Sequence, residues 1–314
     1  MTANIAGGPV DVRVGDASGA AVSRTVRGRH HDPRNRRSSL LTILLWTCAL
    51  YFLFPLVWLV VASTKDNADL FSSFGLWFGQ NFSLWKNLVN VFTTQDGIFL
   101  HWILNTVLYA GVSAVGASLL STMAGYAFAK YDFPGGKLLF SITLGAIMIP
   151  MTALAIPTYL LFSKAGITNS PWAIIVPSLV SPFGVFLMRV YAADAIPDSL
   201  IEAARVDGAG EFRIFWQVGL RMLGPGIATV FLFALVATWN NYFLPLVMLN
   251  TSDLYPLTVG LAQLQAASAA GGGAQTLFST VITGSLVSVI PLIVAFLYLQ
   301  RYWQTGLATG GVKG

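Results

Sequence analysis

The sequence PDSLIEAARVDGAG, residues 197–210, is a short charged segment within a chain that is otherwise almost entirely apolar. Ser199 and Glu202 have the spacing of a capping box, in which two side chains satisfy free backbone N–H groups at a helix start. Pro197 cannot continue a helix from behind, and Gly208 or Gly210 can end one by adopting a positive φ. The pattern predicts about two and a half turns of helix, which is not stable alone because nucleation is costly. The rest of the chain or a partner must therefore hold this helix.

The composition indicates a membrane protein. Of 314 residues, 55% are hydrophobic and 10% are charged, whereas roughly a quarter of the residues in soluble proteins are charged. This length suits one domain of several spans and gives no sign of a second globular core. The single cysteine, Cys48, lies in an apolar run, so no intrachain disulfide can form.

Six apolar runs are long enough to cross a membrane. The first, Leu40–Ala62, has about 23 residues, enough for a hydrocarbon core of roughly 30 Å. It exceeds the roughly 7–15 apolar residues of a signal peptide, so we interpret it as an uncleaved span. The other runs are Trp102–Ala129, Leu138–Phe162, Trp172–Met188, Met222–Leu249 and Phe278–Leu299. Since no run has Asp, Glu, Lys or Arg in its core, the sequence predicts an all-α, polytopic membrane protein with six transmembrane helices.

The domain organisation follows from these runs. Residues 1–39 are rich in Gly, Ala and Arg without apolar periodicity, which predicts a disordered basic tail. Residues 63–100 mix charges with tryptophans, which is typical of a loop near the membrane interface. We therefore expect a tail over 1–39, a first transmembrane helix over 40–62, an extracytoplasmic loop over 63–100, a core of five transmembrane helices over 101–301, and a C-terminal tail over 302–314.

The positive charges predict the orientation. With a cytoplasmic N-terminus, 15 of the 18 lysines and arginines fall on the inner side, and the outer side keeps only Lys65, Lys86 and Lys164. Cytoplasmic loops gather Lys and Arg, so both termini and residues 197–210 are expected in the cytoplasm. The same asymmetry accounts for the net charge of +5 without nucleic acid.

Small and polar residues interrupt the apolar runs. A stripe of small residues in the second run recurs every four positions: Ser113, Ala117, Ser121, Gly125 and Ala129. Such a stripe favours close helix packing over direct contact with a substrate.

Prolines and amides mark further interruptions. Pro150, Pro157, Pro177 and Pro182 favour kinks, which line pathways in some membrane proteins and are only structural in others. Trp239, Asn240 and Asn241 form the most polar point of the fifth run. Their amides must bond neighbouring helices or face a wet cavity.

No motif in the chain supplies chemistry or energy. The spans lack the ionisable group that proton-coupled transport usually needs. Gly135-Gly136-Lys137 lacks the spacing of a phosphate loop, and Gly271-Gly272-Gly273 lacks its strand and lysine. No catalytic, metal-binding or cofactor-binding constellation is evident, so any energy for uphill work must come from another polypeptide.

The segment quoted at the start resembles the EAA loop of permease subunits of binding-protein-dependent ABC importers. Glu202-Ala203-Ala204 and Asp207-Gly208-Ala209 carry the match. The sugar-permease, MalG-like branch is also similar in these stretches: Asn169–Ile175, Ser181–Arg189, Trp239–Asn241, Gly306-Leu307 and Gly310–Gly314. The resemblance covers about residues 101 to 314 and departs at Arg221, where the family usually has proline.

The resemblance implies the type I ABC importer permease fold, with a cytoplasmic EAA coupling loop over about 190–221. Its expected partners are a second, MalF-like permease, two ABC ATPase subunits and an extracytoplasmic sugar-binding protein, in the bacterial inner membrane. ATPase coupling falls to Glu202, Ala203, Ala204, Asp207 and Gly208. Trp239, Asn240 and Asn241 are expected along the translocation path. Gly271, Gly272 and Gly273 lie in an outer loop that either contacts the binding protein or is a passive linker.

Other interpretations remain open at this point. Glu202 can simply cap its helix and pair with Arg205. The main hypothesis is a permease that imports a di- or oligosaccharide, with glycerol-phosphate-type solutes also possible in the branch. The alternative is a secondary carrier or passive channel that needs no ATPase, and a membrane enzyme ranks last because no catalytic constellation is evident.

Overall fold

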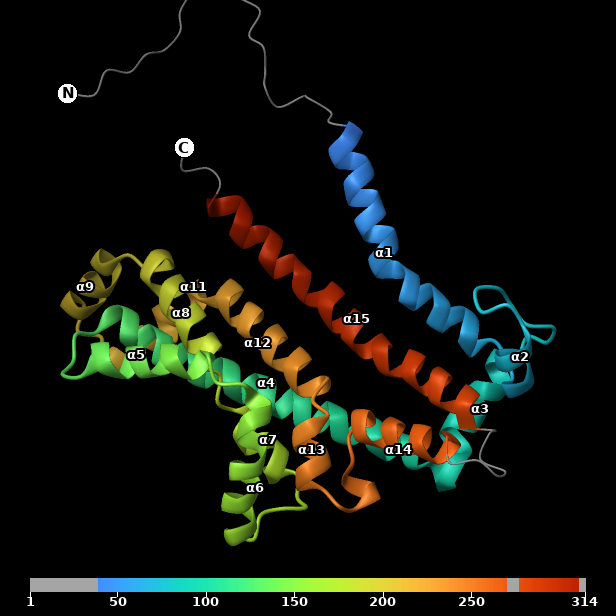
Figure 1. The fold of residues 1–314 in the computed structure, drawn as a ribbon. Helices are drawn as coiled ribbons and strands as arrows, with labels where there is room; N and C mark the ends of the chain where they lie inside the picture. Colours follow the sequence, from blue (N-terminus) through green and yellow to red (C-terminus); the bar gives the residue numbers. More distant parts are fainter. Residues whose placement is uncertain (1–38, 270–276, 311–314) are drawn as a thin grey trace, which may run out of the picture. The chain divides into compact units, whose positions relative to one another are not determined.

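Helices account for all the regular structure that the computed structural model describes, which comprises residues 39–269 and 277–310 (Figure 1). The α-helices are α1 Ser39–Ser63, α2 Asn67–Ser72, α3 Leu84–Thr93, α4 Ile98–Lys130, α5 Gly136–Ile147, α6 Ala155–Lys164, α7 Trp172–Ser178, α8 Pro182–Ala195, α9 Asp198–Val206, α10 Glu211–Ile214, α11 Leu220–Met222, α12 Gly224–Trp239, α13 Phe243–Met248, α14 Leu257–Ala269 and α15 Leu277–Gly310. The chain divides into units 1–52 and 53–314. The described part of the first unit is the start of α1, and the packing below lies within the second.

Four helical stretches in the described residues are long and apolar enough to cross a membrane. They are Ser39–Ser63, Leu84–Lys130, Trp172–Ala195 and Leu277–Tyr302. Two more spans form only as bent pairs. The α5 and α6 segments meet at 99° where Pro150 interrupts the third apolar run, and α10–α11 meets α12 at 78°. The described residues thus provide between four and six spans, which is consistent with the predicted six.

Helix α4 is the centre of the bundle because it packs along both α8 and α12. The predicted small-residue stripe faces these helices: Ser113, Ala117 and Ser121 are at most 1% exposed, and Gly125 is buried. A Cβ atom at Gly125 would lie 2.6 Å from Cβ of Met188 and 2.7 Å from the backbone nitrogen of Arg189 on α8. The interpretation of the stripe as a close-packing surface is confirmed.

The N-terminal half of α4 holds the loop before α14. Trp102 Nε1 donates to the Ser252 carbonyl at 3.0 Å, and the Tyr109 hydroxyl donates to the Leu254 carbonyl at 2.9 Å. Thr106, one helical turn after Trp102, accepts through Oγ1 from the backbone N–H of Leu257 at 2.8 Å. These positions share one face of the helix, so a single stripe satisfies backbone groups that would otherwise be buried without partners.

Two segments predicted as loops contain helices. Residues 63–100 include α2 and α3, and α3 packs on α15 and α4. Lys65, counted among the outer charges, is only 1% exposed and donates through Nζ to the Phe74 carbonyl at 2.8 Å. Residues 257–269, which precede the three glycines of the predicted outer loop, form α14. These segments are short, so packing against other helices decides their structure. Their mixed composition alone therefore did not indicate helices.

The contact at Gly125 gives a test of the bundle. We expect Gly125→Ala to lower the free energy of unfolding by about 1–3 kcal/mol, because the methyl group overpacks the crossing of α4 and α8. Thermal unfolding of the purified chain in detergent measures the change. The matched control is Gly111→Ala on the same helix, where a new Cβ has no neighbour within 4 Å. An equal loss in both variants would show that α4 does not depend on this close approach.

Candidate functional site

Helix α9 occupies the segment that the sequence singled out. It has nine residues, Asp198–Val206, in agreement with the predicted length, and Gly208 follows it with φ +78°. The predicted capping box is wrong. The N-cap is Pro197, which makes no side-chain hydrogen bond. The helix begins two residues earlier than the capping box requires, so Ser199 lies inside its first turn.

An apolar core fixes the inner face of α9. Ile201 is 4% exposed and belongs to one cluster with Met188 of α8, Tyr126 of α4, and Ile214 and Phe215 after α9. The helix thereby rests on the crossing of α4 and α8 and does not depend on its own propensity.

Lys130 ties the end of α4 to the start of α9. Its Nζ donates to the Ile196 carbonyl at 2.6 Å and to Asp198 Oδ1 at 2.7 Å. The Lys130 side chain is 5% exposed, while that of Asp198 is 80% exposed. A buried ammonium is stable only with such acceptors, so Lys130 holds the α8–α9 turn in place.

Glu211 connects the C-terminal end of α9 to the C-terminal end of α4. Arg205 donates through Nε to Oε1 at 2.7 Å and through Nη2 to Oε2 at 3.3 Å, and the Tyr131 hydroxyl donates to Oε2 at 2.7 Å. Arg205 and Tyr131 thus both bind the Glu211 carboxylate at the start of α10. The expected pairing of Glu202 with Arg205 is therefore replaced by Arg205 with Glu211.

The outer face of α9 is open. Glu202, Ala203, Asp207 and Gly208 are exposed, while Ala204 is half-buried against the core cluster. Val206, at 88% exposed, adds an apolar side chain to this face.

Two exposed aromatic rings lie just beyond the helix. Phe212 and Trp216 stack with ring centroids 6.0 Å apart and are 74% and 55% exposed. Small, acidic and apolar groups thus adjoin on one rigid surface. We call these residues, 202–208 with Phe212 and Trp216, the α9 surface.

The loop leaves α9 through a distorted helix. Residues 215–219 form a π-helical turn, and the chain then bends by 78° into α12. Arg221 lies exposed in α11, and Pro225 occupies the first turn of α12, where its missing N–H costs no helical hydrogen bond. The departure at Arg221 is accordingly accommodated within a helical connection.

The three consecutive residues predicted along the path have different surroundings in the structure. Trp239 is 7% exposed and donates through Nε1 to the Ser288 carbonyl of α15 at 3.2 Å. Asn240 is exposed, and its amide donates to the Val236 carbonyl at 3.0 Å. Asn241 Oδ1 accepts from the Leu244 backbone at 3.4 Å. The amides therefore satisfy the break between α12 and α13 instead of bonding through their side chains to neighbouring helices.

Other expectations concern residues that the structure does not describe. Gly271, Gly272 and Gly273 lie outside the described residues, as do residues 1–38 of the N-terminal tail and 311–314 at the C-terminus. Within the described ranges, no group of three or more His, Cys, Asp or Glu side chains is arranged to hold a metal ion.

The sequence did not reveal Lys130, Tyr131 and Glu211 as parts of the site. Lys130 and Tyr131 lie 66 to 80 residues from their partners, and Arg205 lies six residues before Glu211. None of these separations matches the three or four residues of a helical pair. The remaining signal was the position of Lys130 at the end of a long apolar run.

Apolar helices around α4, with a polar helix held on their core, define a polytopic α-helical membrane protein. Over residues 117–304 the sequence matches the family described as binding-protein-dependent transport system inner membrane component. The chain belongs to this family, and the predicted resemblance to importer permeases is confirmed.

Individual relatives agree with this assignment. The arabinooligosaccharides transport system permease protein AraQ of Halalkalibacterium halodurans is 35% identical over 88% of this chain and 97% of its own length. The lactose transport system permease protein LacG of Rhizobium radiobacter is 29% identical, over 86% and 94%. A chain in the crystal structure of a bacterial ABC transporter involved in alginate import shares the fold, with a TM-score of 0.72 at 23% identity, over 84% of this chain and 95% of that one.

The Glu211 junction yields a test of how α9 is held. We expect Glu211→Ala to speed backbone hydrogen exchange over residues 198–209 about fivefold, because it removes the pair with Arg205 and the hydrogen bond from Tyr131 and so makes local opening easier. Exchange followed by mass spectrometry measures this change. Asp132→Ala is the control, since Asp132 is exposed next to Tyr131 and makes no ion pair among the described residues. Unchanged exchange in Glu211→Ala would mean that the apolar core and Lys130 fix α9 without the Glu211 junction.

Proposed function

We propose that this chain is the permease subunit of an ATP-driven importer and couples to a separate ATPase through the α9 surface. The observation that carries the proposal is a short helix whose inner face is fixed by Ile201 and Lys130, while its outer face exposes small and apolar groups. Exposed apolar residues on a rigid surface are typical of a protein interface. Ala203 lets a partner approach closely, and Glu202 and Asp207 can meet basic groups.

Movement of a docked ATPase would reach the spans by a short route. Asp198 and Glu211 contact the end of α4, and Ile201 packs on α8 and α4. A displacement of α9 would therefore push on both α4 and α8 near their close contact at Gly125. Rigid-body rocking of such a packed group is an established way to exchange inward and outward access.

The proposed assembly contains two ABC ATPase subunits, a second, MalF-like permease and an extracytoplasmic sugar-binding protein. The charge distribution supports cytoplasmic termini and a cytoplasmic α9 surface. We further propose that Gly271, Gly272 and Gly273 contribute to the contact with the binding protein. Lipid is expected to cover the remaining apolar faces, as in other multi-pass inner-membrane proteins.

The proposed substrate is a di- or oligosaccharide. Support comes from the named substrates of the arabinooligosaccharide and lactose permeases. A related permease of Yersinia pestis is named for sn-glycerol-3-phosphate, so this solute class is the second candidate. Asn240 is our choice for a path residue because its amide is exposed at the break after α12, whereas buried Trp239 positions that break against α15.

Coupling is tested in proteoliposomes that contain the complete complex. We expect Glu202→Ala to reduce uptake at least tenfold with ATP hydrolysis largely retained, because the ATPase loses its hold on α9. Gly208→Ala should act similarly, since a non-glycine residue at φ +78° costs about 1–2 kcal/mol and distorts the helix end. Gly210→Ala is the matched control, with φ −70° and open space around a new Cβ.

Two results would overturn the coupling proposal. One is wild-type uptake in both Glu202→Ala and Gly208→Ala at normal expression. The other is substrate flux through the purified chain in liposomes without ATPase or ATP, which would favour the secondary carrier or passive channel. Turnover of a substrate by the isolated chain would instead indicate a membrane enzyme.

The path assignment has its own test. We expect Asn240→Ala to reduce oligosaccharide uptake about tenfold through loss of one or two hydrogen bonds to sugar hydroxyls, while ATPase activity without substrate stays unchanged. Uptake of labelled sugar by the complete complex measures this effect. Asn81→Ala removes an exposed amide outside the apolar segments and serves as the control. Equal uptake in both variants would remove Asn240 from the path.

A further inference from the structure

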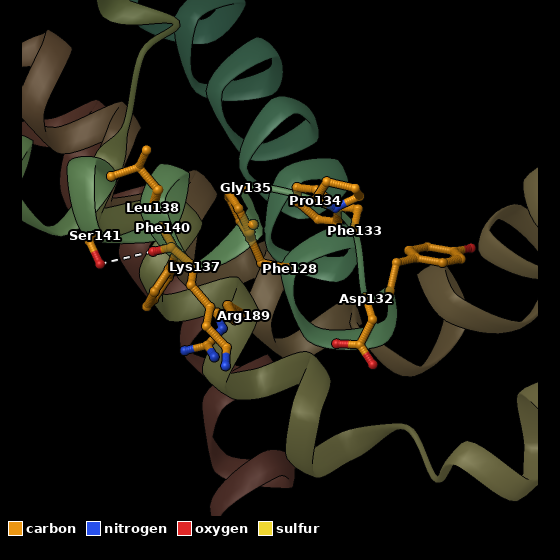
Figure 2. Close-up of a pocket in the computed structure, with 12 residues that line it drawn as sticks. Phe128, Asp132, Phe133, Pro134, Gly135, Lys137, Leu138, Phe140, Ser141 and Arg189 are labelled. Atoms are coloured by element: carbon orange, nitrogen blue, oxygen red, sulfur yellow. Dashed lines mark hydrogen bonds between the residues drawn. The ribbon is translucent and has the colours of Figure 1, made fainter.

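A pocket of about 920 Å³ lies at the junction of α4, α5 and α8 (Figure 2). Its lining includes Phe128 at the end of α4, the turn 131–135, Lys137 at the start of α5, and Arg189 of α8. Gly135, with φ +81°, shapes the turn that leads into α5. The coupling residues of the α9 surface do not line this pocket.

Two cations share one side of the pocket without an acidic partner. Figure 2 shows the side chains of Lys137 and Arg189 directed to the same edge, with Asp132 on the opposite side. Neither cation forms an ion pair with any residue that the structure describes. The guanidinium carbon of Arg189 lies 4.0 Å from the centroid of the Phe140 ring, which orients the group but leaves its charge uncompensated.

The rest of the lining is largely aromatic and apolar. Phe128 contacts both Phe133 and Phe140, with ring centroids 5.7 and 5.5 Å apart. Leu138, at 65% exposed, extends this apolar wall outward along α5 toward the region that lipid is expected to occupy. A cationic edge next to an open apolar wall matches a molecule with an anionic head and a hydrocarbon tail.

We propose that this pocket binds the phosphate of an anionic phospholipid, such as phosphatidylglycerol, with Lys137 and Arg189 on the headgroup and the acyl chain along Leu138. Arg189 suits the phosphate oxygens because its planar donors can bind them in pairs, and Lys137 adds a mobile point charge. The free N–H groups at the start of α5 contribute further positive potential. A soluble phosphate shares the headgroup chemistry, but it would leave the apolar wall unused.

The site would brace the α4–α5 turn against α8 beside the α9 loop. Tyr131 lines the pocket and also donates to Glu211, so the lipid and the α9 junction meet at one residue. The inference goes beyond the proposed transport function, and binding can be measured without transport.

The test uses the full chain in nanodiscs made of phosphatidylcholine and phosphatidylglycerol, with retained lipids counted by native mass spectrometry. We expect selective retention of phosphatidylglycerol, with affinity reduced about fivefold by Lys137→Gln or Arg189→Gln and more strongly by the double variant. Lys137→Arg should retain the lipid because the charge is kept. Arg221→Gln, which removes an exposed cation outside the pocket, should behave as wild type.

Two outcomes would overturn the proposal. One is equal retention of phosphatidylglycerol by wild type and by Lys137→Gln. Because the Lys137 side chain is exposed, the variant should keep the wild-type melting temperature, so that reduced retention reports on the site and not on misfolding. The other arm adds millimolar inorganic phosphate to discs of phosphatidylcholine alone. Thermal stabilisation by phosphate there, lost in the double variant and without selective phosphatidylglycerol retention, would assign the site to a soluble anion.

Discussion

The close approach of α4 to α8 is the constraint on which the other contacts depend. At Gly125 the α8 backbone lies where a side chain would otherwise be, and at Gly184 a Cβ would fall 2.6 Å from Ser121 Oγ and 2.9 Å from Val230 Cγ1. Small residues let backbones meet, and in lipid this packing replaces the hydrophobic effect between helices. The same contact brings the end of α4 to the end of α8, which is what allows Lys130 to reach Ile196 and Asp198.

The α9 helix shows how a marginal element becomes rigid. A helix of nine residues is not stable alone because nucleation is unfavourable. Its stability comes from Ile201 in the core and from the polar junctions at Lys130 and Glu211. Burying Lys130 is costly, but a carbonyl and a carboxylate compensate its charge. Both junctions end on Lys130 and Tyr131, which are neighbours at the C-terminal end of α4, so α9 is tied to that helix at a single point.

The sequence predicted the features that repeat regularly and missed those that depend on distant residues. Apolar length indicated the spans, the four-residue spacing indicated the stripe, and Gly208 indicated the end of α9. The helix starts two residues before the predicted position, because Asp198, which accepts a hydrogen bond from Lys130 of another helix, belongs to its first turn. Pro150 marked a kink, but the 99° bend depends on packing. Helix α3 is amphipathic but only ten residues long, and it lies in a segment whose charges and tryptophans indicated a loop. Helices α2, α3 and α14 all pack against α15, a contact that the local sequence does not show.

The break between α12 and α13 unites these themes. A helix that ends within an apolar region leaves carbonyls and N–H groups that lipid cannot satisfy. Asn240 bonds the carbonyl of Val236, Asn241 receives the N–H of Leu244, and Thr258 donates to the carbonyl of Asn241 at 2.7 Å. The break is thus nearly self-sufficient, and α15 needs to provide only the acceptor for Trp239. Local bonds therefore stabilise the interruption, and the amide of Asn240 stays exposed beside it although its nitrogen is already bonded to the Val236 carbonyl.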